Sequence, residues 1–373
     1  MPDKAHHICL VGGGHAHLAV LADWIERGLP CRSATLLTPH PTLRYSGMVP
    51  GWVSGQYDRD AGLVDIAALA ERASVHLVLD RCVGLDPAKR TIATGGGREI
   101  AFDIASFDTG GVGRARKILG DDRRLLDIRP IDRFVTELEE RMPGLGALPR
   151  LAVVGGGAGG VEIAFALRNA ALARTRPEVV LVAGSEGLLP GFARAVRQKV
   201  ICAFADQRIE IVMHDARFEG GALVAGGRSL EPLDLVVAAV GSGAPDWPGA
   251  SGLSVDEAGF IAVDRHQRSI SHPDIFAVGD VASRQDRDVT HSGVHAVKAG
   301  PTLAANLRVA SQGGEPKRVY SPRQASLYLL STGDGSAIAS YRPFAAEGRW
   351  VSKLKHRIDT RWIRKYARLG GNL

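Results

Sequence analysis

The stretch ICLVGGGHAH at residues 8–17 decides how the rest of the chain is organised. An apolar run leads directly into three glycines, and apolar residues then recur at three- and four-residue steps. This pattern predicts a strand, a tight turn and the start of a helix, where backbone N–H groups meet a pyrophosphate. Gly12 and Gly14 fit the dinucleotide fingerprint G-x-G-x-x-G, and His17 stands in place of its third glycine.

A second copy, VVGGGAGG at residues 153–160, has the complete fingerprint spacing. Each copy is followed by short strands and then by a strand that ends in glycine, at Thr109-Gly110 and at Gly241. The chain therefore contains an internal repeat of a dinucleotide-binding unit. Two such units in one chain predict two cofactors that face each other.

The composition is that of an ordinary soluble globular protein, with 373 residues, 45% hydrophobic and 23% charged. This length allows two or three domains. The four cysteines lie far apart and form no C-x-x-C pair, so we expect neither a zinc site nor a local redox disulfide. We expect no other metal site, and a reducing, cytoplasmic setting. No apolar run approaches the roughly 18 residues that a membrane span needs.

The excess of positive charge is concentrated in the tail. Residues 349–368 contain eight Lys and Arg side chains against Asp359 alone, while the whole chain has a net charge of +6. The remainder is near neutral, so a nucleic-acid-binding surface is not indicated.

Both strands that normally end in a ribose-binding acid lack it. Thr38 and Pro39 follow the second strand of the first unit, and Ala183 follows that of the second unit. No arginine stands directly after the latter strand to bind a 2′-phosphate, although Arg194 or Arg197 can fold back. The sequence leaves the choice between NADH and NADPH open.

Three further segments have a functional and a plain interpretation. Residues 44–55 are rich in Gly and Pro, which predicts either a loop laid over a flat ligand or an irregular surface connection. Asp280 ends a buried strand and is either a ligand for sugar-like hydroxyls or a helix N-cap. Residues 350–366 form an amphipathic helix that either lies on an anionic membrane or packs against the body or a second subunit in a homodimer.

The motifs VGGGHAH, VVGGGAGGVE, AVGSG and IFAVGD, with the Thr109-Gly110 strand end, resemble the pyridine nucleotide-disulfide oxidoreductase superfamily. Within it, the chain resembles type II NADH dehydrogenases and sulfide:quinone oxidoreductases. YSGMVPGWVSG, HAVKAGPTLAANL, LYLLSTGDGSAIAS and the tail pattern W-x-x-x-L-K-x-x-I-D are most similar to the flavoprotein module fused to selenide, water dikinase. The kinase domain has no counterpart in this sequence.

The resemblance implies an α/β fold of two Rossmann-like domains, the first discontinuous, followed by a C-terminal hairpin and amphipathic helix. The implied boundaries are 1–115 with 265–320 for an FAD-binding domain, 116–264 for an NAD(P)-binding domain and 321–373 for the C-terminal part. The expected FAD-binding residues are Gly12, Gly14, His15, Ala16, Thr38, Pro39, Gly47, Met48, Val83, Thr109, Gly110, Gly279, Asp280, His295 and Ala296. The expected NAD(P)-binding residues are Gly155, Gly157, Ala158, Gly159, Gly160 and Gly241. Glu162 matches the family's glutamate near the contact of nicotinamide and flavin, and is the candidate catalytic residue.

Three functions remain open. The first is an FAD-dependent oxidoreductase that passes hydride from NAD(P)H to flavin and on to a small-molecule acceptor, with a quinone favoured because no cysteine pair is present. The second is a sulfide- or selenium-linked flavin oxidoreductase. The third is a non-catalytic FAD-binding protein, suggested by the two missing acids. For the first, a location at the inner face of the cell membrane would suit a quinone partner.

Overall fold

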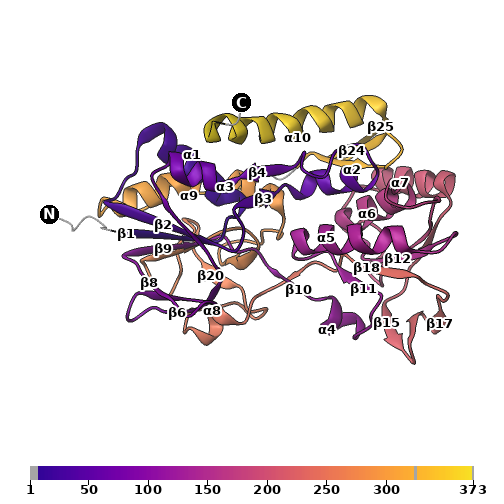
Figure 1. The fold of residues 1–373 in the computed structure, drawn as a ribbon, viewed down its shortest axis with the longest axis horizontal. Coiled ribbons are helices and arrows are strands. Elements are labelled where there is room, and N and C mark those ends of the chain that lie inside the picture. The colour runs from indigo at the N-terminus through magenta and orange to yellow at the C-terminus, as the bar shows by residue number, and fades with distance from the viewer. Residues whose placement is uncertain (1–6, 323–325, 372–373) are drawn as a thin grey trace.

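The computed structural model describes residues 7–322 and 326–371. Its framework consists of two parallel sheets with the same strand order, which confirms the two-unit α/β fold (Figure 1). The first sheet has the order β21 (Ile275–Ala277), β9 (Ile104–Phe107), β1 (His7–Val11), β2 (Ser33–Thr38), β5 (His76–Leu79). The second has the order β11 (Leu125–Asp127), β18 (Leu235–Ala238), β12 (Arg150–Val154), β13 (Glu178–Val182), β14 (Ile209–Val212).

In each sheet the glycine turn follows the central strand, which is the first strand of its unit's glycine motif and has later strands of the chain on both sides. β1 pairs with β2 on one side and with β9 on the other, and β12 pairs likewise with β13 and β18. A crevice opens at this point in a parallel sheet, outside the carboxyl ends of the strands. The two glycine turns are therefore at the places where a doubly wound sheet binds its ligand.

Three-stranded antiparallel sheets and two-stranded pairs complete the β structure. The three-stranded sheets are β6 (Cys82–Asp86), β7 (Thr91–Thr94), β8 (Glu99–Ala101); β15 (Ala216–Glu219), β16 (Ala222–Ala225), β17 (Arg228–Ser229); and β23 (Tyr328–Ser331), β24 (Ala337–Tyr341), β25 (Phe344–Gly348). The strand pairs are β3 (Thr42–Arg44) with β4 (Leu63–Asp65), β10 (Val112–Gly113) with β19 (Ser242–Gly243), and β20 (Ile261–Val263) with β22 (Ala282–Arg284), of which the last pair is parallel. The expected C-terminal hairpin is β23–β24, and β25 adds a third strand that the sequence did not indicate.

The helices cover the sheets and connect their strands. The α-helices are α1 (His15–Arg27), α2 (Val49–Val53), α3 (Ile66–Arg72), α4 (Ala115–Leu119), α5 (Ile131–Arg141), α6 (Ala158–Arg168), α7 (Arg194–Gln207), α8 (Trp247–Ala250), α9 (Gly293–Ser311) and α10 (Arg349–Gly370). The 3₁₀ turns are η1 (Ser46–Met48), η2 (Met142–Gly144) and η3 (Gly279–Val281). No helix within the described ranges is long and apolar enough to cross a membrane.

The expectation that residues 44–55 are irregular is wrong. They contain η1 and α2, and α2 is buried through its whole length. Pro50 fits because it stands in the first turn of α2, where its missing N–H breaks no helical hydrogen bond. Trp52 and Val53 belong to the same apolar core as α6, so this half of the segment is not a surface connection.

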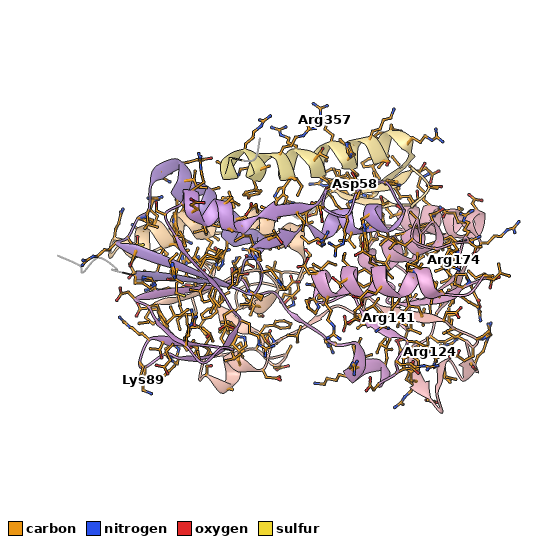
Figure 2. All side chains as sticks on the ribbon, viewed as in Figure 1. Asp58, Lys89, Arg124, Arg141, Arg174 and Arg357 are labelled. Carbon is orange, nitrogen blue, oxygen red and sulfur yellow. The ribbon has the colours of Figure 1, made fainter. Side chains whose placement is uncertain are left out.

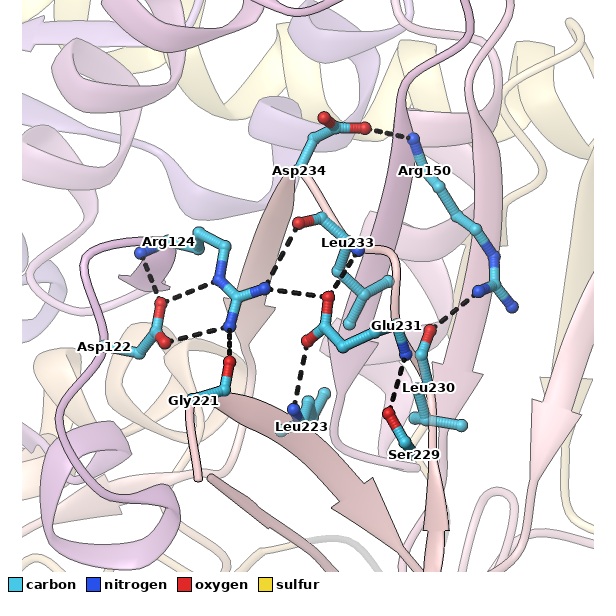
Figure 3. A network of polar contacts seen from close by, with 10 residues as sticks. All are labelled: Asp122, Arg124, Arg150, Gly221, Leu223, Ser229, Leu230, Glu231, Leu233 and Asp234. Atoms are coloured by element: carbon cyan, nitrogen blue, oxygen red, sulfur yellow. Dashed lines mark hydrogen bonds and ion pairs between the residues drawn. The ribbon is translucent and has the colours of Figure 1, made fainter. Parts of the chain in front are cut away.

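A network of polar contacts joins three segments of the second unit through Arg124 (Figure 3). The Arg124 guanidinium contacts both carboxylate oxygens of Asp122 at 2.9 Å and the Glu231 carboxylate at 2.8 Å, and donates to the carbonyl of Gly221 at 2.7 Å. Glu231 also accepts the backbone N–H of Leu233. The start of β11 is thereby joined to the β15–β16 turn and to the segment that enters β18.

Helix α10 runs along the outer side of the molecule, over α3 and β4 and across β24 and β25 (Figure 1). Five apolar or aromatic residues recur at four-residue steps along this helix, and they differ in how far they are exposed. Tyr366 is buried and Trp362 packs beside it in the core of the first unit, while Trp350, Leu354 and Ile358 are exposed. The helix thus packs on the body and keeps an apolar flank toward solvent.

Helices α1 and α9 cross so closely that one residue has no room for a side chain. A Cβ on Gly300 would lie 2.7 Å from the Ala19 Cβ and 2.9 Å from the Ala16 carbonyl oxygen. We expect Gly300→Ala to lower the free energy of unfolding by about 1–3 kcal/mol, because the helices must move apart. Urea denaturation followed by tryptophan fluorescence measures this change.

Gly146 is the matched control, since its Cβ position meets no atom within 4 Å. Gly146→Ala should leave the free energy of unfolding unchanged or slightly raised. Equal losses in the two variants would contradict the steric explanation.

Candidate functional site

The first glycine turn is held against the end of β9. Gly12 has φ +94°, and a Cβ there would lie 2.3 Å from the Asp108 carbonyl oxygen. A Cβ on Gly14 would lie 2.3 Å from the carboxyl carbon of Asp108. Both positions therefore require glycine, and the turn brings its backbone directly onto the strand end.

Asp108 is a site residue that the sequence analysis did not single out. Its carboxylate accepts the N–H groups of Ala16 at 2.7 Å and His17 at 3.0 Å, and its side chain is buried. Burial raises the pKa of this carboxyl to about 7, against the effect of these hydrogen bonds. The earlier N–H groups of the turn are left for an anionic ligand. The signal was present in the sequence as an acid directly before Thr109-Gly110.

His17 replaces the third glycine with a structural contact. Its ring is buried, with Nδ1 2.6 Å from the Gly12 carbonyl oxygen and Nε2 2.9 Å from the Ser106 hydroxyl. Burial lowers its pKa to about 4, so the ring is neutral near pH 7. His17 braces the turn against β9.

Two buried polar atoms above the turn have no hydrogen-bond partner among the described residues. They are Nε2 of His15, at the start of α1, and Oγ of Ser292, the residue before α9. The Gly293 Cβ position lies 3.9 Å from the His15 ring and 3.8 Å from the Ser46 hydroxyl, so α1, α9 and η1 converge here. Orphaned polar groups of this kind are satisfied by a ligand or by water. The cradle thus fits a polar ligand that lies across both helix N-termini.

A small cavity adjoins the second of these two polar groups, and Ser292 is part of its lining. Its walls include Ala277, Gly279, Ser292, His295 and Ala296, three of which were expected FAD-binding residues. His295 Nδ1 lies 2.7 Å from the Tyr320 hydroxyl, which fixes the ring at the rim.

Asp280 does not cap a helix with its side chain. Its Oδ2 lies 2.8 Å from the Arg129 guanidinium and accepts the Ser242 hydroxyl at 3.1 Å. Ser242 lies in β19, on the segment that connects the two sheets, and Arg129 follows β11 of the second sheet. Oδ1 accepts no hydrogen bond from the described residues, and remains able to bind a hydroxyl.

The other expected residues of the first site differ in their exposure. The Thr38 hydroxyl is buried and lies 3.0 Å from the Gly13 Cβ position. Gly47 lies in η1, and its carbonyl oxygen accepts the Lys355 ammonium at 3.1 Å. The remaining members range from buried to exposed: Met48 (buried), Gly110 (half-buried), Pro39, Val83 and Thr109 (exposed).

The second glycine turn has the same geometry as the first, with glycine at all three positions of the fingerprint. A Cβ on Gly155 would lie 2.3 Å from the Ala239 carbonyl oxygen, and one on Gly160 only 1.9 Å from the Gly155 carbonyl oxygen. Gly157, Gly159 and Gly241 meet no atom within 4 Å, so these positions are open to a ligand. Ala158 begins α6 directly above the turn.

Glu162, on α6, belongs to a buried cluster of charges. Its Oε1 accepts the N–H of Ser331 at 2.9 Å and lies 3.8 Å from Lys355 Nζ on α10. Lys355 Nζ also lies 3.3 Å from Asp359, whose other oxygen accepts the Tyr45 hydroxyl at 3.2 Å. Burial raises the pKa of Glu162 and of Asp359, and Lys355 opposes both shifts.

An aromatic stack adjoins this cluster. Tyr45 stacks on Trp362 with ring centroids 4.6 Å apart, and the His15 ring lies 5.5 Å from Trp362. Sequence reasoning found His15 and Glu162 but missed Tyr45, Lys355 and Asp359, since residues more than 300 positions apart in the chain meet here.

The four cysteines are free thiols. Cys9 is buried in β1 and Cys202 is exposed on α7. Burial raises the pKa of Cys9, Cys31 and Cys82, which keeps these thiols protonated and weakly nucleophilic.

Comparison with known proteins agrees with this geometry. The family model described as pyridine nucleotide-disulphide oxidoreductase matches residues 6–305. Ferroptosis suppressor protein 1 of Taeniopygia guttata is 22% identical over 289 residues, 74% of this chain and 72% of that protein. The NADH oxidase of Streptococcus pneumoniae is 30% identical over 207 residues, 50% of this chain and 42% of that protein.

Solved structures share the fold over nearly the whole chain. NDH2 from Plasmodium falciparum, in complex with NADH, superimposes with a TM-score of 0.79 at 14% identity, covering 97% of this chain and 98% of that one. The sulfide:quinone oxidoreductase of Aquifex aeolicus gives 0.78 at 16% identity, covering 98% and 92%. The chain therefore belongs to the pyridine nucleotide-disulphide oxidoreductase family, and it is an oxidoreductase that uses FAD as cofactor and NAD(P)H as substrate.

Proposed function

We propose that the chain transfers hydride from NAD(P)H to FAD and passes the electrons to a quinone-like acceptor. The observation that carries this proposal is the pair of glycine turns at equivalent points of two like-ordered sheets, with Glu162 buried in a charge cluster that reaches the first site through Tyr45. The name of the sulfide:quinone oxidoreductase among the similar structures supports the acceptor class, and that of NDH2 in complex with NADH supports the donor. When bound, FAD supplies the two-electron redox chemistry.

The first turn is the proposed FAD site. The N–H groups of Gly13, Gly14 and His15 hold the pyrophosphate, since that of Gly12 donates to the Leu37 carbonyl. Asp280 binds a ribityl hydroxyl through its free oxygen. His15 and Ser292 gain partners for their orphaned atoms. The N-terminus of α9 places positive dipole at Ser292–Ala296, where it stabilises negative charge.

The second turn is the proposed NAD(P)H site, built on Gly155, Gly157, Ala158, Gly159, Gly160 and Gly241. We assign Glu162 to the nicotinamide side of this site, because α6 carries it one helical turn beyond the glycines. Lys355 fixes the glutamate and offsets part of its buried charge. The absence of a cysteine pair speaks against a disulfide or sulfide reaction at this site.

The outer flank of α10 is the proposed membrane contact. Trp350 is 58% exposed and Phe344, on the adjoining β25, is 74% exposed. Arg357 projects outward from the same helix (Figure 2). Exposed aromatic groups beside many Lys and Arg match an anionic lipid surface, such as the cytoplasmic leaflet where a quinone acceptor is dissolved.

The first prediction concerns electron transfer. Mixed anaerobically with NADH or NADPH, the yellow holoprotein should lose its absorbance near 450 nm, since hydride reaches the flavin. Stopped-flow absorbance measures the rate. Bleaching by sulfide or selenide alone would select the second function, and bleaching by no donor would leave only FAD binding.

Glu162→Gln tests the assigned residue within the same experiment. We expect FAD to remain bound and the rate of bleaching to fall by roughly tenfold or more, because a charge next to the reacting centre is lost. Glu139→Gln, at a partly exposed position on α5, is the control and should bleach at the unchanged rate. An unchanged rate in Glu162→Gln would contradict the assignment.

A second prediction concerns pH. The pKa of Asp108 is about 7 without ligand, and a bound pyrophosphate raises it further, so FAD binds best to the protonated carboxyl. Affinity for FAD should therefore be constant below pH 6 and fall by up to about tenfold per pH unit above pH 7. Fluorescence quenching of FAD by the apoprotein measures this affinity.

Asp108→Asn keeps an acceptor for the N–H groups of Ala16 and His17 but does not titrate. Its affinity for FAD should not vary in this pH range. A flat profile in the unchanged protein, with both proteins folded by circular dichroism, would contradict the prediction, because FAD binding would then leave the proton occupancy of Asp108 unchanged.

A third prediction tests the membrane contact. The protein should co-sediment with vesicles that contain phosphatidylserine, and less with phosphatidylcholine alone or in high salt. The double variant Phe344→Ser, Trp350→Ser should bind roughly tenfold more weakly, since two exposed aromatic groups are lost. Leu148→Ser, at a 78% exposed position between η2 and β12, is the control and should bind as before. Equal binding by all three proteins would contradict the proposal. If the unchanged protein forms concentration-dependent dimers and the double variant does not, the flank is instead a contact with a second copy.

A further inference from the structure

The loop after β13 lies directly on the second glycine turn. A Cβ on Gly156 would lie 2.3 Å from the Gly187 carbonyl oxygen and 2.6 Å from that of Ala183. The N–H of Leu189 donates to the Gly156 carbonyl at 2.8 Å. A dinucleotide whose pyrophosphate is held by this turn therefore extends its adenosine half along residues 183–187.

The carboxylate that β13 lacks is supplied by the next strand of the sheet. Asp215 follows β14, and its Oδ1 accepts the N–H of Ser185 at 2.9 Å. A Cβ on Gly184, which has φ +77°, would lie 3.1 Å from the same oxygen. The Asp215 side chain thus lies beside the loop where the fingerprint normally has its acid.

Asp215 is exposed and its charge is stabilised. The hydrogen bonds from Ser185 lower the pKa of its carboxyl, so it is ionised at neutral pH. A carboxylate has about four acceptor positions, so Asp215 can accept an incoming hydroxyl in addition to the hydrogen bonds from Ser185.

Besides Asp215, the loop has an acid of its own and a histidine beside it, since His214 precedes Asp215 and contributes to the lowered pKa of its carboxyl. Glu186 is exposed on the loop itself. Arg194 and Arg197 lie on α7, and neither makes a hydrogen bond or ion pair with residues 183–187 in the described part of the chain. The two arginines that the sequence offered for a 2′-phosphate are therefore not engaged at this loop.

We propose that Asp215 selects NADH over NADPH. Its carboxylate accepts the 2′-hydroxyl of the adenosine ribose, and its charge repels the phosphate that NADPH carries at the same position. This inference rests on the proposed function only in requiring a nicotinamide nucleotide at the second glycine turn. It replaces the missing strand-end acid by a residue more than thirty positions further along the chain.

Binding of NAD⁺ and NADP⁺ to the holoprotein, measured by isothermal titration calorimetry, tests the proposal without turnover. NAD⁺ should bind at least tenfold more tightly than NADP⁺. In Asp215→Asn the preference should fall to threefold or less, because the repulsive charge is gone. The ratio of kcat/KM for NADH and NADPH should change in parallel.

Two variants separate Asp215 from other acids. Asp206→Asn, at an exposed position on α7, removes a charge from the same unit and should keep the preference for NAD⁺. Glu186→Gln should also keep it. An equal affinity of the unchanged protein for both nucleotides, or a loss of preference in Glu186→Gln but not in Asp215→Asn, would overturn the inference. If neither nucleotide binds or bleaches the flavin, the proposed function itself falls together with it.

Discussion

The structure depends on the direct contact between each glycine turn and the strand end behind it. Gly12 presses against the Asp108 carbonyl, and Gly155 against that of Ala239, at distances that admit no Cβ. This contact places the N-terminus of the following helix over the carboxyl ends of the parallel strands. Helix N–H groups and their dipole then face one point, where an anionic ligand is stabilised. A side chain at Gly12 or Gly155 would push the turn away from the strand end behind it.

The two copies satisfy this constraint in different ways. In the second, Gly160 lets α6 approach the turn so closely that its own Cβ would overlap the Gly155 carbonyl. In the first, His17 occupies the equivalent position and uses its ring to bridge Gly12 and Ser106. Asp108 then accepts the N–H groups that a ligand does not reach. The first turn is thus supported by buried polar contacts, which are stable only because each group has a partner.

Helix α10 contributes side chains to both candidate sites. It contributes Lys355 to Glu162 of the second unit, and Asp359 and Trp362 to Tyr45 beside the first turn. Two buried carboxylates share one ammonium group, so the cluster holds more negative than positive charge, and burial raises the pKa of both acids. The inner face of α10 therefore closes the site, while its outer flank, with Trp350, remains available to a surface.

The sequence by itself determined the α/β class, the internal repeat and the location of both glycine turns, because these follow from apolar runs, glycine spacing and helical periodicity within short windows. It also indicated FAD and NAD(P)H through a resemblance that spans most of the chain. Only the tertiary structure showed that α2 is buried, that Asp215 stands beside the loop after β13, and that Lys355, Asp359 and Tyr45 meet Glu162. Local patterns carry no information on which distant segments pack together, because that choice is made by the burial of whole faces and by the pairing of buried charges.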